Sequence, residues 1–219
     1  MLEYRLDLPE TGPVILCIGS HSDDIEIGCG GTLLKILRRH PMAHLHYVVY
    51  CAGGKRADEA SAAIGRIVRK ESKLSLHLFD YRDGYLPYEG GGPKEDLQDI
   101  AADVDPDVIF THFREDAHQD HRLVSEITRN IFRDHAILEY EIPKFDGDLG
   151  RPNFYSVLSE QQLERKIQII IDSFKTQSDK HWFTAETFRS IARIRGIEAG
   201  REHTYAEAFF VQKALFALD

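Results

Sequence analysis

The fold of this chain is decided by the stretch VILCIGSHSDD, residues 14–24. Residues 14–19 carry no charged or strongly polar side chain, which is typical of a strand buried on both faces of a sheet. An imidazole and two carboxylates, from His21, Asp23 and Asp24, then follow the end of that strand. Open α/β sheets place their binding sites at the carboxyl ends of their strands. We therefore expect a functional site at this edge of the sheet.

A second polar cluster, His118-Gln119-Asp120-His121, follows the strand-like run 107–112 and ends where the pattern becomes helical. The two clusters together offer the His and Asp ligands of an open zinc site, with a carboxylate and an imidazole to spare for proton transfer. His21 and Asp24 are three residues apart, so one ion can reach both, and Asp23 points elsewhere. Of His118 and His121 only one need bind the ion, and Asp120 between them can hydrogen-bond an imidazole.

Strand-like and helix-like segments alternate along most of the chain, a pattern typical of βαβ units on a mostly parallel sheet. We predict an α/β fold with helices on both faces of the sheet. The expected strands are 14–20, 45–51, 75–80, 107–112 and 136–141, and the expected crossover helices are 32–39, 58–69, 95–103 and 122–133. A short strand near 154–158 and two helices, 160–176 and 184–198, follow, and Ser159 with Gln162 has the spacing of a capping box.

Two glycine-rich stretches are expected to shape the site. Gly28-Cys29-Gly30-Gly31 lets the backbone approach a ligand or metal closely, because no Cβ atom intervenes. It lacks the GxGxxG spacing of a dinucleotide site and follows acidic residues that would repel a pyrophosphate, which argues against nicotinamide or flavin binding. The segment Gly84–Pro93 is expected to be a loop and a mobile rim of the site.

The composition limits the class of protein. With 219 residues, 42% of them hydrophobic, the chain is expected to form one domain over residues 1–219. Its formal charge of -9 argues against a nucleic-acid partner, so we expect a small-molecule substrate. Three cysteines without CxxC spacing favour a reducing cytoplasm over a disulfide framework. No run approaches the roughly 18 apolar residues of a membrane span, and no secretory signal is expected at the start. A homo-oligomer is compatible with the sequence.

The remaining unusual residues are given structural interpretations. His40, His44 and His46 lie around a turn and a strand start, where solvated or packed side chains are expected. His112 either lines the pocket or caps its strand. Cys29 is expected to pack in the core rather than bind metal, and Trp182 and the aromatic tail are expected to be core.

The two clusters resemble those of one known family. Residues 21–31 together with 118–121 are similar to the paired motifs of the PIG-L/LmbE-like zinc-dependent deacetylases. Softer similarities extend through Arg56, Glu59, Asp83-Gly84, Ser178 and the run 205–209. Ser22 departs from the family, which usually has proline there; the change alters the stiffness of the turn and removes no reactive group.

The resemblance implies a Rossmann-like α/β fold and hydrolysis of an N-acetyl group from an amino sugar or its conjugate. It implies that His21, Asp24 and His121 bind Zn²⁺, for which Fe²⁺ is an alternative. Asp23 is then the general base, a protonated His118 stabilises the oxyanion, and Asp120 orients His118. Either His118 or Asp23 protonates the leaving amine. Arg56 and Asp83 are candidate contacts to sugar hydroxyls, with a surface ion pair as the alternative.

Two other functions remain open at this point. One is a metal-dependent hydrolase of another amide, such as an acylated antibiotic intermediate or a thiol precursor. The other is a sugar-binding protein of the same fold without catalysis.

Overall fold

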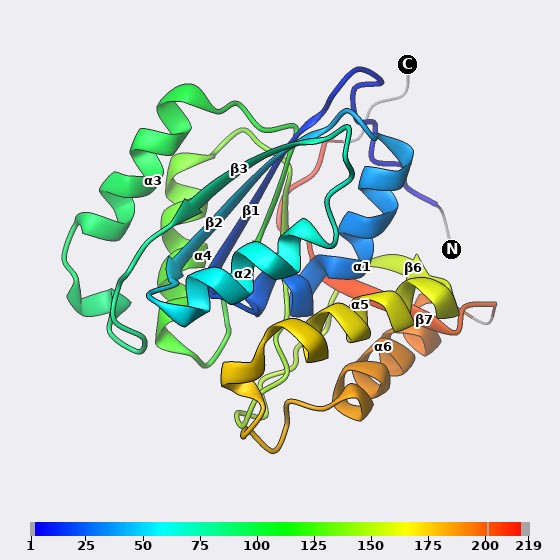
Figure 1. Ribbon diagram of the computed structural model, residues 1–219. Coiled ribbons are helices and arrows are strands. Elements are labelled where there is room, and N and C mark those ends of the chain that lie inside the picture. The colour runs from blue at the N-terminus through cyan, green and yellow to red at the C-terminus, as the bar shows by residue number, and fades with distance from the viewer. Residues whose placement is uncertain (1–2, 201, 216–219) are drawn as a thin grey trace.

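The computed structural model describes residues 3–200 and 202–215 of the chain (Figure 1). Its strands are β1 (Val14–His21), β2 (His44–Cys51), β3 (Lys73–Leu78), β4 (Val108–His112), β5 (Ile137–Tyr140), β6 (Phe154–Leu158) and β7 (Tyr205–Phe210). Its helices are α1 (Asp24–Arg39), α2 (Lys55–Gly65), α3 (Gly92–Asp103), α4 (Gln119–Ile131), α5 (Glu160–Ser173) and α6 (Ala185–Ala199), with short 3₁₀ turns η1 (Leu86–Tyr88) and η2 (Lys175–Gln177). The alternation expected from the sequence is therefore present.

The strands form one seven-stranded sheet in the order β3-β2-β1-β4-β5-β7-β6. The first five of these are parallel to one another, and β7 runs antiparallel to both β5 and β6. The strand order changes direction between β1 and β4, which are neighbours although two strands separate them in sequence. A crevice opens at such a switch point, outside the carboxyl ends of the strands. Both predicted polar clusters lie there.

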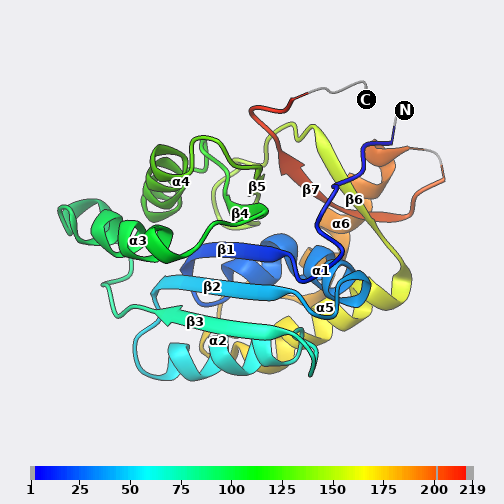
Figure 2. The ribbon, with the colours of Figure 1, turned by 90° about the horizontal axis from the view of Figure 1, so that it is seen from above.

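Helices cover both faces of the sheet, as predicted (Figure 2). Alternate residues of β1 point to opposite faces: Ile15 and Cys17 join the core under α1, α2 and α5, whereas Leu16 and Ile18 join the core under α3 and α4. The central strands β1 and β4 are buried nearly throughout, which is why their sequences are continuous apolar runs rather than alternating ones.

Helix α1 corrects the interpretation of the glycine-rich stretch. The helix begins at Asp24 rather than near residue 32, so Gly28–Gly31 lies inside it and not in a loop beside the site. The absent side chains allow close packing: a Cβ on Gly31 would lie 2.6 Å from Leu158 and 3.0 Å from Glu207, and one on Gly28 would collide with Tyr140. These glycines let the helix approach β5, β6 and β7, because there is no room for a larger residue.

A buried ion pair contacts the backbone of α1 at the same place. The Glu207 carboxylate accepts hydrogen bonds from the backbone N–H groups of Gly31 at 2.7 Å and Thr32 at 2.6 Å. Lys166 of α5 donates to Glu207 at 2.7 Å and to the carbonyl of Ile27 at 2.6 Å. The carboxylate and the ammonium thus satisfy helix backbone groups within this turn.

Strand β7 was not foreseen, although the residues that form it were expected to be core. It fills the gap between β5 and β6, and Phe209 in it is fully buried. The capping box of α5 is confirmed: Ser159 and Gln162 exchange hydrogen bonds of 3.2 and 2.8 Å. The loop expected over residues 84–93 contains η1 and the first two residues of α3.

Among the described residues, no helix is long and apolar enough to cross a bilayer. All three cysteines are buried free thiols, and the Cys29 thiol lies 3.3 Å from the carbonyl oxygen of Ile25.

Candidate metal centre and active site

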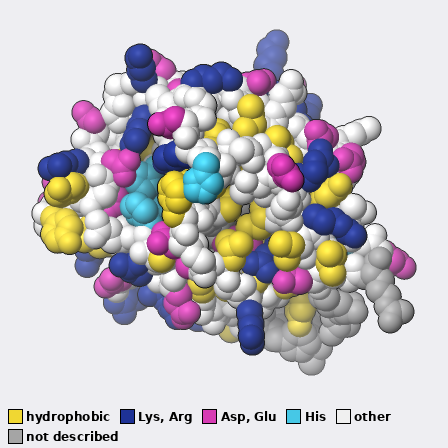
Figure 3. All heavy atoms as spheres, turned by 90° about the horizontal axis from the view of Figure 1, so that it is seen from below, with side chains coloured by type: hydrophobic (Ala, Val, Ile, Leu, Met, Phe, Trp, Pro, Cys, Tyr) yellow, Lys and Arg dark blue, Asp and Glu magenta, His cyan; other side chains and the backbone are white. Residues whose placement is uncertain are grey.

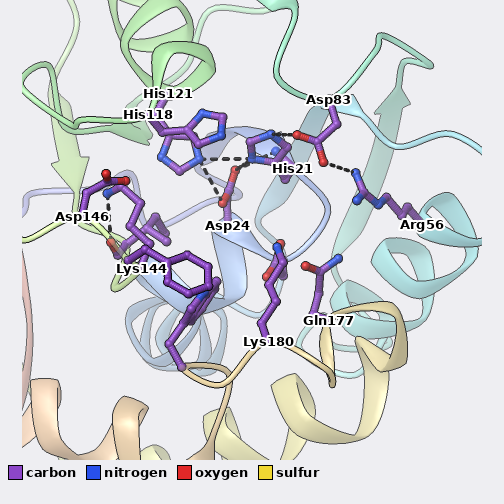
Figure 4. Close-up of a pocket in the computed structure, with 14 residues that line it drawn as sticks. His21, Asp24, Arg56, Asp83, His118, His121, Lys144, Asp146, Gln177 and Lys180 are labelled. Carbon is purple, nitrogen blue, oxygen red and sulfur yellow. Dashed lines mark hydrogen bonds and ion pairs between the residues drawn. The ribbon is translucent and has the colours of Figure 1, made fainter.

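The fold brings the two polar clusters together at the switch point. His21 is the last residue of β1, and Asp23 and Asp24 begin α1 directly after it. His118 and His121 lie at the start of α4. Figure 4 shows the imidazoles of His118 and His121 beside the imidazole of His21 and the carboxylate of Asp24. Residues about a hundred positions apart thus share one site because β1 and β4 are adjacent.

Three of these side chains converge at distances that suit one metal ion. Nδ1 of His21 lies 3.1 Å from Nε2 of His121 and 3.4 Å from Oδ2 of Asp24. Nε2 of His121 lies 3.5 Å from Oδ1 of Asp24. A tetrahedral zinc ion with bonds of 2.0–2.1 Å holds its ligand atoms about 3.3 Å apart, which is close to these separations. The donor atoms of the three residues, counting both oxygens of Asp24, are therefore spaced as the ligands of one such ion would be.

The two histidines differ in their protonation. Burial and the neighbouring His112 lower the pKa of His121 to about 3, so its ring is neutral, as a metal ligand must be. Burial opposes a charge on His21, but Asp24, Asp120 and Asp83 raise its pKa well above the usual value. The carboxylates around His21 thus favour a positive charge at this position, and a bound metal ion supplies one.

Asp24 is held by a backbone donor and lies beside the buried ring of His112. Its Oδ2 accepts a 2.6 Å hydrogen bond from the backbone N–H of His21 and lies 3.1 Å from Nε2 of His112. Burial opposes its ionisation, but His121, His112 and His21 lower its pKa well below the usual value. Asp24 is therefore a carboxylate, the form that binds metal.

His112, for which the sequence left two interpretations, lies within the site. It is fully buried behind Asp24, and its Nε2 accepts a 3.0 Å hydrogen bond from the backbone N–H of Ser20. Donor atoms of Asp24, His112 and His121 lie close enough for one ion, and so do those of His21, His118 and His121. The bond from Ser20 occupies the lone pair of His112 Nε2, which favours His21 over His112 as a ligand.

Asp116 is a site residue that the sequence analysis missed. Its Oδ2 accepts a 3.0 Å hydrogen bond from Nδ1 of His121, which turns Nε2 of that ring toward Asp24. Its Oδ1 accepts from the backbone N–H of His118 at 2.7 Å, and Lys144 donates to its Oδ2 at 2.9 Å. A carboxylate bonded to the far nitrogen of a metal-binding histidine fixes its tautomer. In the sequence, the signal that could have indicated this role was the position of Asp116 five residues before His121.

Asp120 has different partners from those expected. Its carboxylate accepts from the backbone N–H groups of Gly84 at 2.7 Å and Leu86 at 3.2 Å, and it lies 3.3 Å from Nε2 of His21. Its link to His118 runs through its own backbone N–H, 3.2 Å from Nδ1 of that ring. The carboxylate therefore orients His21 and holds the start of the segment that was expected to be a mobile rim, rather than orienting His118.

Asp23 and His118 line the pocket from opposite clusters. Burial and then the neighbouring Asp24 raise the pKa of Asp23 to about 6, although Lys180 and His21 act in the opposite direction. Burial and the nearby His21 lower the pKa of His118, which opposes the protonated state expected for it. In this arrangement Asp23 holds a proton more readily than an ordinary aspartate does, and His118 holds one less readily than an ordinary histidine.

Arg56 and Asp83 are brought to the pocket together. The guanidinium of Arg56 lies 2.7 Å from Oδ2 of Asp83, and Oδ1 of Asp83 lies 3.1 Å from Nε2 of His21. Figure 4 shows this chain of ion pairs along one wall of the pocket. The pair is therefore an ion pair that borders the site, and its contact with sugar hydroxyls stays a prediction.

The pocket has a volume of about 240 Å³ and is lined by both clusters and by residues from the last third of the chain. Figure 3, a view from below, shows histidine side chains at the surface among hydrophobic, acidic and basic ones. The later residues that line the pocket are Ile142, Lys144, Phe145, Asp146, Gln177, Lys180 and Trp182. Trp182, which was expected to be core, packs against the core and also lines the pocket.

Comparison with known structures agrees with the fold. The N,N'-diacetylchitobiose deacetylase from Pyrococcus horikoshii superposes with a TM-score of 0.68 at 21% identity, covering 95% of this chain and 87% of that one. GalB, the 4-carboxy-2-hydroxymuconate hydratase from Pseudomonas putida KT2440, superposes with a TM-score of 0.73 at 16% identity, covering 94% and 99%. Since one of these proteins is a deacetylase and the other a hydratase, the fold alone leaves the reaction open.

Sequence comparisons are more specific. The uncharacterized deacetylase YaiS of Escherichia coli (strain K12) is 30% identical over 138 residues, which are 59% of this chain and 74% of that protein. The family model for PIG-L, described as GlcNAc-PI de-N-acetylase, matches residues 16–132. That range is more than half of the chain and contains both polar clusters. The chain therefore belongs to the PIG-L family of de-N-acetylases and is a hydrolytic deacetylase.

Proposed function

We propose that this enzyme is metal-dependent and removes the N-acetyl group from an amino sugar of the N-acetylglucosamine type, or from a conjugate of one, releasing acetate and a free amine. The observation that carries the proposal is the convergence of His21, Asp24 and His121 at 3.1–3.5 Å, with Asp23 and His118 on the same pocket. The description of the matching family, which names an N-acetylglucosamine conjugate, supports this type of substrate.

Zn²⁺ is the ion we propose, with Fe²⁺ as the alternative, and His21, Asp24 and His121 would hold it. When bound, such an ion lowers the pKa of water and polarises a carbonyl group. Two imidazoles and one carboxylate are suitable donors for either ion. Asp116, on the far nitrogen of His121, and Asp120, on the far nitrogen of His21, would orient the two rings.

The proton transfers are assigned to the residues that do not bind metal. Asp23 is buried next to Asp24 on the pocket wall, and it accepts the proton of the attacking water. His118, on the opposite side of the pocket, hydrogen-bonds the oxyanion that forms as the amide carbonyl is attacked. Collapse of that tetrahedral species breaks the carbon–nitrogen bond, and we assign the proton that the amine takes up to Asp23.

We propose that Arg56 and Asp83 contact the sugar hydroxyls, since both line the pocket and their pairing fixes their side chains. The substrate is a small molecule in this account, with no nucleic-acid or membrane partner and a cytoplasmic location. Another acylated small molecule, such as an antibiotic or thiol-precursor conjugate, is the competing substrate.

The test is a panel of N-acetylated sugars, nucleotide sugars and acylated non-sugar amides, each incubated with protein stripped of metal and then loaded with Zn²⁺ or Fe²⁺. We expect equal amounts of acetate and free amine from at least one sugar, and none after metal removal. Turnover confined to the non-sugar amides would contradict the proposed substrate. Full activity in the metal-free protein would contradict the metal dependence.

A further inference from the structure

A second pocket lies beside β5, between the end of α4 and the residues that follow β7. Figure 2 shows β5 between β4 and β7, with α4 alongside. None of the residues that line this second pocket lines the pocket of the metal-binding side chains. Its volume of about 470 Å³ falls within the roughly 300–1,000 Å³ range of pockets that enclose small molecules. The second pocket is therefore large enough for a ligand of its own.

The second pocket is basic, although the chain is acidic overall. The chain has a formal charge of -9, yet the described residues that line this pocket include four cationic side chains and only one carboxylate. The carboxylate is Glu139, and the cations are Arg114, Arg129, Arg133 and Lys213. Burial raises the pKa of Glu139, which disfavours its charged form. The local charge therefore favours an anionic ligand.

The guanidinium groups at the second pocket lack close acidic partners. Nε of Arg129 lies 3.9 Å from Oε1 of Glu139, which is beyond hydrogen-bond distance, and the Arg129 side chain is 30% exposed. Nε of Arg133 donates to the carbonyl of Asn130 at 3.1 Å, so this contact uses no carboxylate. Within residues 3–200 and 202–215, neither Arg114 nor Arg133 forms an ion pair. The outer nitrogens of these guanidinium groups are therefore available to a ligand.

The buried polar network behind this pocket is incomplete. Among the described residues, Nε of Arg129, Nδ1 of His135 and Oε1 of Glu139 are buried atoms without a hydrogen-bond partner, and all three side chains line the second pocket. Such atoms are uncommon, because buried polar groups are normally paired. They are enclosed by protein and do not themselves contact a ligand. They show that Glu139 does not satisfy the Arg129 guanidinium, which an anion at its outer nitrogens would do.

Hydrogen bonds tie the walls of the second pocket to one another. Oε2 of Glu139, in β5, accepts from the backbone N–H of Arg114 at 3.2 Å and from Nε2 of Gln212 at 3.2 Å. The Lys213 ammonium donates to the carbonyl of Arg133, just beyond the end of α4. The residues after β4, after α4 and after β7 are thus held around β5. A frame that is already ordered loses less conformational entropy when a ligand binds.

The end of α4 explains only part of this positive charge. Basic side chains are common in the last turn of a helix, where they face unpaired carbonyl groups, and Arg129 occupies such a position. Arg114 belongs to no helix: it follows β4, yet it lines the same pocket. Guanidinium groups from two separate segments therefore meet at one cavity, an arrangement that favours recognition of an anion.

From these observations we propose that the second pocket binds a small molecule that carries a phosphate group. A phosphate monoester has three terminal oxygens and can accept hydrogen bonds from more than one guanidinium, whereas a carboxylate offers two oxygens. A phosphate group alone would leave most of the 470 Å³ unfilled, so the ligand has an organic part, for which Phe132 and Ile137 supply apolar lining. This site does not depend on the proposed deacetylase reaction.

The test is isothermal titration calorimetry of the metal-loaded protein with uridine monophosphate, glucose 6-phosphate and inorganic phosphate. The two organic phosphates distinguish a nucleotide from a sugar phosphate as the source of the phosphate group. We expect a Kd below about 1 mM for at least one of them, and binding at least about tenfold weaker for inorganic phosphate, uridine and glucose. Glucuronate, which has a carboxylate where glucose 6-phosphate has its phosphate, should also bind at least about tenfold more weakly than the better organic phosphate.

Substitutions then locate the bound phosphate. Arg114→Gln and Arg129→Gln should each weaken binding of the better organic phosphate by about 10- to 100-fold, the effect of losing a hydrogen bond between charged groups. Arg114 is exposed, so its substitution tests the site even if Arg129→Gln fails to fold. Arg38→Gln is the matched control, because Arg38 lies in the last turn of α1, as Arg129 does in α4, and lines neither pocket. It should leave the Kd unchanged.

Three results would overturn the proposal. One is a Kd above about 1 mM for both organic phosphates. Another is binding of inorganic phosphate or glucuronate as tight as that of the better organic phosphate. The third is binding that persists in both Arg114→Gln and Arg129→Gln but disappears when the metal is removed, since this would place the phosphate at the metal-binding residues.

Discussion

Asp116→Asn is expected to weaken metal binding without removing any residue that binds the metal. Three donors meet the Asp116 carboxylate: Nδ1 of His121 at 3.0 Å, Nζ of Lys144 at 2.9 Å and the backbone N–H of His118 at 2.7 Å. An asparagine side chain offers one acceptor oxygen and one NH₂ group, so at least one donor loses its partner. The NH₂ group facing His121 would favour the wrong tautomer of that ring.

The expected magnitude follows from this loss. Replacing a group that orients a metal-binding histidine typically costs 10- to 100-fold in metal affinity, or about 1.4–2.7 kcal/mol. The measurement is competition for Zn²⁺ between the protein and a chromogenic chelator. Asp148→Asn is the control, because Asp148 also pairs with Lys144, at 2.6 Å, and has no contact with His121 among the described residues. Zinc affinity in Asp116→Asn equal to that of Asp148→Asn would refute the orienting role.

Three further predictions concern the fold. Gly31→Ala should destabilise the protein by about 1–3 kcal/mol, because its Cβ would lie 2.6 Å from Leu158; a shift of the urea midpoint measures this. Glu207→Gln should cost about 3–5 kcal/mol in the same assay, since it leaves the Lys166 ammonium buried without its partner, and a cost below 1 kcal/mol would show that the ion pair is unimportant. Burial and two neighbouring histidines lower the pKa of His46 to about 4. Because the unfolded chain binds this proton near pH 6.5, stability should fall as the pH drops from about 6.5 to 4, and His46→Gln should make that decline shallower.

The sequence predicted the parallel core of the fold because buried parallel strands have a distinctive composition. Residues 14–21 and 108–112 are almost entirely apolar up to their last residues, so both strands and the polar clusters after them could be located. Strand β7 was missed because Glu207 interrupts its apolar pattern. That carboxylate is buried against α1 and Lys166, a partnership that only the tertiary structure reveals.

The candidate site could likewise be predicted only in part. The two polar clusters were enough to suggest a shared ion, because strand ends of a parallel sheet meet at one edge. The choice of His21, Asp24 and His121 as its ligands came from the resemblance to the family. The partners of Asp120 could not be predicted, since they are backbone N–H groups of residues 84 and 86 in a distant segment. The glycines of residues 28–31 were misplaced because glycine weakens a helix locally, whereas here close packing against Leu158 and Tyr140 outweighs that cost.

The central claim is that two adjacent carboxylates have different roles, Asp24 in binding the metal and Asp23 in transferring the proton. The most direct measurement is acetate released per bound metal ion in Asp23→Asn and Asp24→Asn, with metal content determined on the same samples. The account predicts that Asp23→Asn binds one ion per chain and releases acetate at least 100-fold more slowly than the parent, as loss of a general base implies. It predicts that Asp24→Asn retains little metal. A fully loaded Asp23→Asn protein that releases acetate at the parent rate per ion would contradict the account.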